Sequence, residues 1–362
     1  METLDLLRRL SEASGVSGYE SQARDLVAEE LRRYSDETRI DRLGSVIARK
    51  AARGVPKPFG RVMIAAHLDE IGLIVTAQEG PFLRFSTVGG IDQRALPEQR
   101  VLVHGTEPLP GIIGTRPPHV TRSEDREKVT RVEDLVIDTG LDEATLSQRV
   151  RVGDIVSLQR QVTALHNHLV AGKALDNRAS LAALILAMEC LSTVDHTWDV
   201  YAIATVQEEV GLRGAATAAF GVVPDIGIAV DVSFGDASDL PPWQTTPLGS
   251  GPAIPLGPNI HPWVHEKLVK CAQEHEIPHQ ITAEPGDTGT DAWAIQVTRS
   301  GIPTGLLGVP LRYMHSTVET ASIKDIERTS RLLAAFVSSL GEQAIGELGV
   351  KVDVRSPEGG PK

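Results

Sequence analysis

Two adjacent glutamates, Glu208 and Glu209, have the side chains and the position to do acid–base or metal chemistry. They follow an apolar run at 198–206 that predicts a buried parallel strand. Open α/β sheets bind their ligands beyond the carboxyl ends of such strands. A bend at Gly211 would let one glutamate hold a metal ion while the other reaches a water on that ion. Alternatively, both glutamates only begin a helix, where negative charge suits the helix dipole.

Other residues at or just after predicted strand ends, or at a helix start, also have side chains that bind metals. They are His67, Asp176, Asp231 and His315. Together with Glu209 they give two histidines and three carboxylates, a donor set suited to Zn, Co or Mn. If Asp176 bridges two ions, each ion has three protein ligands and room for a shared water. Glu208 is then free to act as general base on that water.

Each of these residues also has a simpler interpretation. A single histidine is more often hydrogen-bonded than metal-bound, and Asp176 is also placed as the N-cap of a helix at 177–191. Asp231 can be a turn residue. Asp69 shares a face with His67 in extended chain, and a carboxylate behind a ligating histidine fixes its tautomer. Spacing alone cannot join these residues, because they are far apart in the sequence.

A literal H-E-x-x-H match at 275–279 is interpreted as coincidence. That motif needs both histidines on one face of an intact helix, and Pro278 removes a backbone donor there. No G-x-S-x-G, Walker A or G-x-G-x-x-G pattern occurs in the chain.

The pattern of elements predicts an α/β protein interrupted by a β-rich insertion. The predicted divisions are a first catalytic segment at 1–70, an inserted β-domain at 71–166, a second catalytic segment at 167–350 and a disordered tail at 351–362. Within the insertion, 121–134 is dense in charges of both signs and is expected to be an exposed loop. The other predicted helices are at 4–10, 19–34, 212–220, 262–275, 291–296 and 322–347, and the other predicted strands at 39–48, 61–66, 226–230, 280–283 and 305–309.

Composition excludes several classes of protein. The formal net charge of −12 disfavours nucleic-acid and anionic-membrane partners, which need basic surface. The 362 residues include two cysteines, Cys190 and Cys271, which suits a reducing cytoplasm rather than a disulfide framework. The sequence shows neither a signal-peptide pattern nor an apolar run of about 18 residues, so a cytoplasmic location is expected.

Eight short segments, taken in order, resemble the family-42 metallo-aminopeptidases, the TET-type cytosolic enzymes that some genomes label glucanases. The resemblance covers nearly the whole chain. The segments are DRLG (41–44), HLDEIG (67–72), GTRPPH (114–119), DNR (176–178), QEEVGLRG (207–214), DVS (231–233), GTDA (289–292) and RYMHS (312–316). One departure is Thr317 after Ser316, where proline is common in the family; it leaves the metal residues intact.

The resemblance implies a role for each matching residue. One ion would be held by His67, Asp231 and bridging Asp176, and the other by Asp176, Glu209 and His315. Glu208 would be the general base and Asp69 the partner of His67. The family fold is a mixed sheet flanked by helices, of the zinc-peptidase (phosphorylase/hydrolase-like) type, interrupted by a small β-rich dimerisation domain. Family members assemble through dimers into hollow dodecamers.

The predicted function is therefore a dinuclear metal-dependent aminopeptidase acting on short peptides, with Zn as the first choice of ion and Co or Mn as alternatives. Asp236 and Asp291 are candidates to anchor the ammonium group of the substrate. The nearest alternative is a carboxypeptidase or N-deacylase on the same scaffold, which would anchor the other end of its substrate. A non-catalytic assembly protein would not need all five ligands and the base. A glucanase would need no metal cluster.

Overall fold

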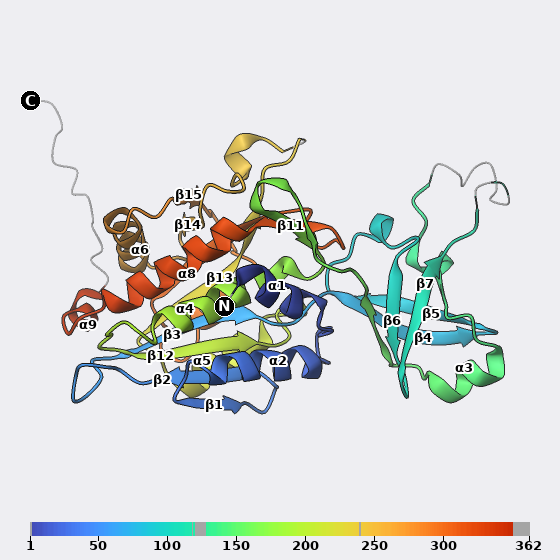
Figure 1. Ribbon diagram of the computed structural model, residues 1–362, viewed down its shortest axis with the longest axis horizontal. Helices are drawn as coiled ribbons and strands as arrows, with labels where there is room; N and C mark the ends of the chain where they lie inside the picture. The colour runs from blue at the N-terminus through green and yellow to red at the C-terminus, as the bar shows by residue number, and fades with distance from the viewer. Residues whose placement is uncertain (1, 118, 120–127, 239, 350–362) are drawn as a thin grey trace, which may run out of the picture.

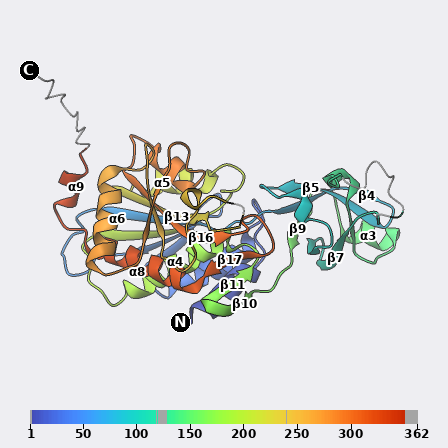
Figure 2. The ribbon, with the colours of Figure 1, turned by 90° about the horizontal axis from the view of Figure 1, so that it is seen from above.

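The computed structural model describes residues 2–117, 119, 128–238 and 240–349. These residues form a large part built on a mixed sheet and a small β-barrel part beside it, as two perpendicular views show (Figures 1 and 2). We call them the sheet part and the barrel part. The predicted α/β fold class is confirmed. The tail at 351–362 and residues 121–127 of the predicted charged loop lie outside the described residues.

The sheet part contains eleven of the described strands, most of them in the order β1-β2-β12-β3-β13-β16-β17-β11-β10. The four central strands, β12, β3, β13 and β16, run parallel to one another, so their carboxyl ends lie at one edge. The strands are β1 (Glu37–Ile40), β2 (Val46–Lys50), β3 (Arg61–His67), β10 (Thr163–Ala164), β11 (Leu169–Gly172), β12 (Asp199–Thr205), β13 (Ile226–Phe234), β14 (Ala253–Leu256), β15 (Gln280–Ala283), β16 (Thr304–Arg312) and β17 (Glu319–Ser322).

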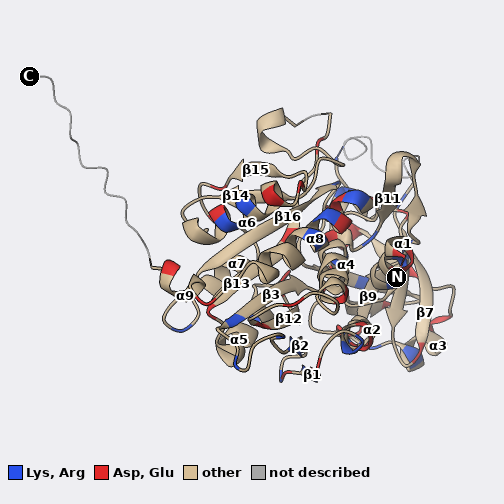
Figure 3. Cartoon of the chain, turned by 60° about the vertical axis from the view of Figure 1, so that its left-hand side comes forward, with Lys and Arg blue, Asp and Glu red and all other residues tan. Residues whose placement is uncertain are grey.

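Helices cover both faces of this sheet because its central strands are apolar on both sides. In β3, Val62 and Ile64 belong to one buried cluster, whereas Met63 and Ala65 belong to the cluster on the opposite face. The first face is covered by α1 (Thr3–Glu12), α2 (Ser21–Arg32), α4 (Leu175–Cys190), α6 (Pro262–Glu274) and α8 (Ile323–Ser338), and the second by α5 (Arg213–Val222) and α7 (Asp291–Gln296). Figure 3 shows the charged residues mainly on the helices and loops around the sheet.

The barrel part closes six strands in the order β4-β5-β8-β7-β6-β9. The strands are β4 (Gly72–Glu79), β5 (Phe82–Val88), β6 (Arg100–His104), β7 (Pro108–Gly114), β8 (Val136–Asp138) and β9 (Ile155–Leu158), and helix α3 (Glu143–Arg149) lies between the last two in sequence. Its interior holds a separate apolar cluster that includes Leu73, Val101 and Ile137. None of the helices in the described ranges is long and apolar enough to cross a membrane. The barrel as a dimerisation domain, and the domain boundaries themselves, stay predictions.

Several local predictions were wrong. The strand predicted at 226–230 continues to Phe234, so Asp231 lies within β13 and not after it. The predicted strand at 39–48 is a hairpin, because the Asp41 carboxylate accepts hydrogen bonds from the N–H groups of Leu43, Gly44 and Ser45 and closes a turn. The helix predicted at 322–347 ends at Ser338, and a separate short helix, α9 (Ala344–Glu347), follows. Asp176 is not a helix cap: α4 begins after Ala174, and no side chain caps it.

Candidate metal centre

The parallel strands bring the predicted site residues to one edge of the sheet. His67 is the last residue of β3, and Asp231 lies in the second half of β13. Glu208 and Glu209 follow β12, where Gln207 turns the chain with a φ of 55°. His315 lies just beyond β16, and Asp176 lies in the first turn of α4. The six side chains that would hold the ions and act as the base therefore meet, although the first and the last lie 248 positions apart in the sequence.

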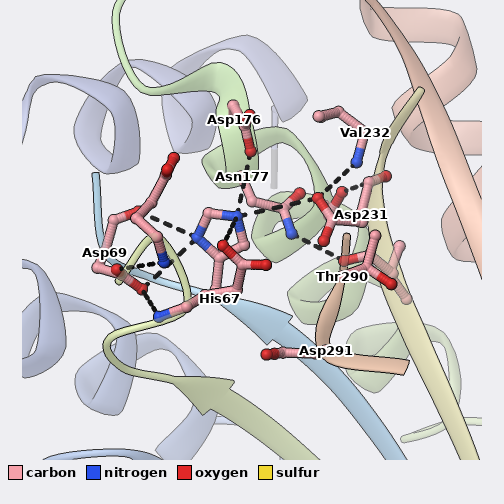
Figure 4. A network of polar contacts seen from close by, with 12 residues as sticks. His67, Asp69, Asp176, Asn177, Asp231, Val232, Thr290 and Asp291 are labelled. Atoms are coloured by element: carbon pink, nitrogen blue, oxygen red, sulfur yellow. Dashed lines mark hydrogen bonds and ion pairs between the residues drawn. The ribbon is translucent and has the colours of Figure 1, made fainter. Parts of the chain in front are cut away.

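One group of donors surrounds the Nε2 atom of His67, which is buried (Figure 4). The distance from this nitrogen to Asp176 Oδ1 is 3.1 Å. Glu208 Oε2 and Asp231 Oδ1 each lie 3.9 Å from it. The ring orientation suits a ligand, because Nδ1 is 3.1 Å from the Asp69 carbonyl oxygen and donates to it. That hydrogen bond leaves the lone pair of Nε2 directed at the carboxylates.

A second group of donors lies around the Nε2 atom of His315. Asp176 Oδ2 is 3.4 Å from this nitrogen, and Glu209 Oε1 is 3.5 Å from it. Asp176 therefore turns one oxygen toward each histidine. Two imidazoles and three carboxylates are donors that Zn, Co and Mn accept. Sets of three donors around His67, either with Glu208 and Asp231 or with Asp176 and Glu209, lie within 4.8 Å of one another, so the donor set fits bound divalent ions.

The electrostatics of this cluster favour a bound cation. Burial raises the pKa of Glu208 to about 10 and that of Glu209 to about 7. Burial also raises the pKa of Asp231 well above its usual range. Hydrogen bonding to Asp176 raises the pKa of His315 to about 9. Carboxylates and imidazoles held this close retain protons unless a metal ion supplies the positive charge instead.

Asp69 contacts the backbone of the two glutamates more closely than the ring of His67. Its carboxylate accepts hydrogen bonds from the N–H of Glu208 at 3.0 Å and the N–H of Glu209 at 3.2 Å. It also accepts one from the Ser17 hydroxyl at 2.6 Å. The nearest carboxylate oxygen lies 3.6 Å from His67 Nδ1, whereas the backbone carbonyl of Asp69 is the closer partner. Asp69 thus fixes both the histidine ring and the segment that carries the glutamates.

The two residues predicted to anchor the substrate lie outside this cluster. Asp236 pairs with Arg312, its Oδ2 being 2.6 Å from a guanidinium nitrogen. Asp291 is buried and accepts a hydrogen bond from the Thr205 hydroxyl, while its Oδ1 has no hydrogen-bond partner. Burial raises the pKa of Asp291 to about 6. Neither residue lines the cavity at the donors, so this geometry does not favour their role as anchors, which stays a prediction.

A cavity of about 490 Å³ opens at the donor cluster. Apolar side chains that sequence reasoning missed form much of its wall. They are Leu212, Val232, Phe234, Trp293 and Met314. Phe234 and Trp293 are large apolar residues that remain exposed. No local pattern identifies such residues, because the cavity forms only where α7, the end of β13 and the loops after β12 and β16 meet.

The barrel part also reaches the cluster. Gly89 and Gly90 follow β5, and a Cβ atom on Gly90 would lie 3.0 Å from His315 Nδ1. A Cβ atom on Gly89 would lie 3.4 Å from Glu209 Oε2. The two glycines thus let the chain pass close to both side chains.

The H-E-x-x-H match plays no part in the cluster. Helix α6 ends at Glu274, so the motif at 275–279 falls beyond its last turn. His279 donates from Nδ1 to the Ile277 carbonyl instead. The interpretation of this motif as coincidence is confirmed.

Comparison with known families gives a match to the M42 glutamyl aminopeptidase family over residues 44–332. That range includes both histidines, all the carboxylates of the cluster and the whole barrel part.

Individual relatives are similar over almost their full length. The chain is 36% identical to the lysyl aminopeptidase of Pyrococcus furiosus, covering 93% of this chain and 97% of that protein. The aminopeptidase APDkam598 of the archaeon Desulfurococcus kamchatkensis has the same fold with a TM-score of 0.89, 36% identity, and coverage of 97% and 98%. The TET1 peptidase of Pyrococcus horikoshii, described as able to assemble into a tetrahedron or a large octahedral shell, gives a TM-score of 0.82 at 32% identity, with coverage of 94% and 100%.

Proposed function

The chain belongs to the M42 peptidase family of aminopeptidases, and from this premise we propose that it is a two-metal enzyme that removes N-terminal residues from short peptides. The observation that carries the proposal is the position of Asp176 between two histidines, with one oxygen toward each. A single structural ion takes four protein ligands, whereas six donor side chains meet here.

Under this proposal the donors divide into two sets. His67, Asp176 and Asp231 would hold one divalent ion, and Asp176, Glu209 and His315 would hold the other. When bound, such ions supply Lewis-acid chemistry: they draw electron density from the scissile carbonyl and make an attacking water more acidic. Zn is the first choice of ion, and Co and Mn suit the same donors.

Glu208 is the general base of the proposal. Its carboxylate lines the cavity, and its Oε2 lies 3.9 Å from His67 Nε2, within reach of a water beside the ligands. It would take a proton from the attacking water and pass that proton to the amine of the departing peptide. Buried among carboxylates, Glu208 has a pKa of about 10. Nearby positive charge lowers a carboxyl pKa, so the cations would leave Glu208 ionised and able to act as a base.

The walls of the cavity suggest which substrates fit. Val232, Phe234, Trp293 and Met314 offer apolar surface beside the donor cluster. Lining by such residues favours a neutral, apolar side chain at the N-terminal position of the peptide. The acidic cluster would attract the free ammonium group of that same residue.

One experiment tests the whole proposal. A dipeptide with a free N-terminus is compared with its acetylated form, before and after chelation and again after adding back Zn, Co or Mn. We expect cleavage of the free peptide alone, loss of activity on chelation, and recovery with at least one of the ions. Preferential cleavage of the acetylated peptide would support an N-deacylase or carboxypeptidase instead. Full activity after complete metal removal would rule out the two-metal mechanism.

We also propose that the chain assembles with copies of itself. The described ability of the Pyrococcus horikoshii relative to form closed shells supports this, as do the exposed apolar side chains of Phe82 and Ile112 on the barrel part. Light scattering on the eluted protein would distinguish a monomer, a dimer and a dodecamer. We further place the enzyme in the cytoplasm, because its two cysteines, Cys190 and Cys271, are unpaired, as suits a reducing compartment.

A further inference from the structure

Glu319 is a buried carboxylate that sequence reasoning did not single out. It is the first residue of β17 and is 1% exposed. Its Oε1 accepts a hydrogen bond from the N–H of His315 at 2.8 Å. Its Oε2 accepts one from the N–H of Asp176 at 3.0 Å. One carboxylate therefore joins the backbones of two predicted ligands that are 139 residues apart in sequence.

Glu319 joins two segments of irregular backbone, which the strand pairing of the sheet does not hold in place by itself. His315 lies between β16 and β17 with a φ of 61°, which is unfavourable for a non-glycine residue. Asp176 lies two residues after Ala174, whose φ is 53°. The backbone angles of Asp176 are themselves non-helical, although it lies within the first turn of α4. Irregular backbone of this kind persists only where the surroundings hold it in place. Strand β17 provides the attachment, because Glu319 pairs with Gly172 of β11 immediately before the Asp176 segment.

Asp69 makes a similar arrangement on the other side of the cluster. Its two oxygens accept from the N–H groups of Glu208 and Glu209, as described above. Each buried carboxylate thus fixes two backbone N–H groups whose own side chains point into the site. Only a carboxylate can do this at both oxygens, because an amide offers one acceptor and turns a donor toward the second N–H.

We propose that Glu319 is a positioning residue that sets the separation of Asp176 and His315, and with it the affinity for the second metal ion. This inference rests on the proposed two-metal function. Glu319 does not line the cavity at the donors, and both of its oxygens accept from backbone N–H groups. Groups that orient the ligands of a metal typically change its affinity about 10- to 100-fold when they are replaced.

The test is the substitution Glu319→Gln, studied by titration of the metal-free protein with Zn in competition with a chelator. We expect two ions per chain at saturation, as in the unmodified protein, but with one of them bound about 10- to 100-fold more weakly. Activity at limiting Zn should fall and recover when more Zn is added, and KM at saturating Zn should stay unchanged. Replacing a residue that only stabilised the fold would lower thermal stability without selectively weakening the binding of one of the two ions.

A matched control is Asp325→Asn. Asp325 is also buried, and its carboxylate likewise accepts from two backbone N–H groups, those of Gly249 and Gly251, but these carry no ligand. This variant should lose thermal stability while binding both ions as the unmodified protein does. If Glu319→Gln does not fold, Glu319→Asp is titrated in its place. Aspartate keeps both carboxylate oxygens on a side chain that is one methylene shorter, so it tests the same two hydrogen bonds.

Two results would overturn the proposal. One is affinity for both ions within about twofold of that of the unmodified protein in the folded Glu319 variant, and the other is an equal loss of affinity in Asp325→Asn. The failure of the proposed function itself looks different, because the unmodified protein would then bind no ions or would need none for activity.

Discussion

The sheet part buries acidic side chains, whereas the described residues of the barrel part bury none. In the sheet part, acidic residues at the strand ends and beside them are buried close together, among them Asp69, Asp176, Asp231 and Glu319. In the barrel part, the buried cluster is apolar, and Ser157 is the one buried polar residue among those described between 72 and 158. Charged pairs of the barrel, such as Arg84 with Glu79, lie at the surface.

This difference in buried charge follows from whether the strands close into a barrel or end at an open edge. The barrel closes on itself, so its six strands fill the interior with apolar side chains. The four parallel strands of the sheet part end at one open edge, where loops can direct polar groups toward a common point. Chemistry is thus concentrated at the open edge, which the barrel part approaches closely at Gly89 and Gly90.

The largest effect should come from Glu208→Gln in the sheet part. The substitution keeps the shape of the side chain but removes the base, so kcat should fall about 100- to 10,000-fold. Ion content should not change, because Glu208 is not one of the proposed ligands. Steady-state kinetics and metal analysis of the same preparation measure both quantities. Glu209→Gln serves as the contrast, since it should lose ion affinity, and a Glu208 variant with kcat close to that of the unmodified enzyme would remove the residue from its role.

A core substitution in the barrel should separate stability from chemistry. Leu83 is fully buried in the barrel, and Leu83→Ala should lower the free energy of unfolding by about 2–5 kcal/mol. Because Leu83 does not contact the donor cluster, kcat of the folded enzyme should change by less than about twofold. Denaturant unfolding and kinetics provide the two readings.

The matched substitution is Leu68→Ala, at an equally buried leucine next to His67. It should cost comparable stability and also reduce kcat, because it loosens the segment that carries a ligand. An equal loss of kcat in Leu83→Ala and Leu68→Ala would mean that packing in the barrel part affects catalysis as much as packing beside His67 does.

The pH dependence of metal affinity should reveal the buried charges of the sheet part. With no ion bound, His315 has a pKa of about 9 and Glu209 a pKa of about 7. Both groups bind metal only when deprotonated, so protons compete with the ion below these values. Affinity should therefore rise between pH 6 and 9, by up to about tenfold per pH unit for each proton released. Chelator competition at several pH values measures this, and a flat profile would contradict it.

The smallest effect should come from Gly90→Ala, where the two parts meet. The new Cβ atom would approach His315 Nδ1 to 3.0 Å, so the ring must move by a few tenths of an ångström. A shift of this size should lower kcat by about tenfold or less, since a misplacement of about 1 Å can cost about 100-fold. Gly114→Ala is the control within the barrel, because its nearest neighbour lies at 3.8 Å. Unchanged kinetics for Gly90→Ala would show that the barrel does not constrain His315.

The sequence by itself determined most of the elements and the chemical identity of the donors. Residue periodicity predicted β15 and α7 with the bounds found in the structure. Predicted strand ends identified His67 and the two glutamates, because the transition from an apolar run to a charged residue is a local signal. The same signal identified Asp231, although β13 does not end there but continues to Phe234. Recognition of the family came from the same short segments.

Tertiary structure alone decided how these residues meet. The position of the Asp176 carboxylate between two histidines and the close contacts of Glu319 and Gly90 all depend on partners distant in sequence. Glu319 and Asp176 lie 143 residues apart, and their contact requires β11 and β17 to pair in one register. Local propensity carries no information about such register, because it is set by the order in which strands pack and by the burial that results.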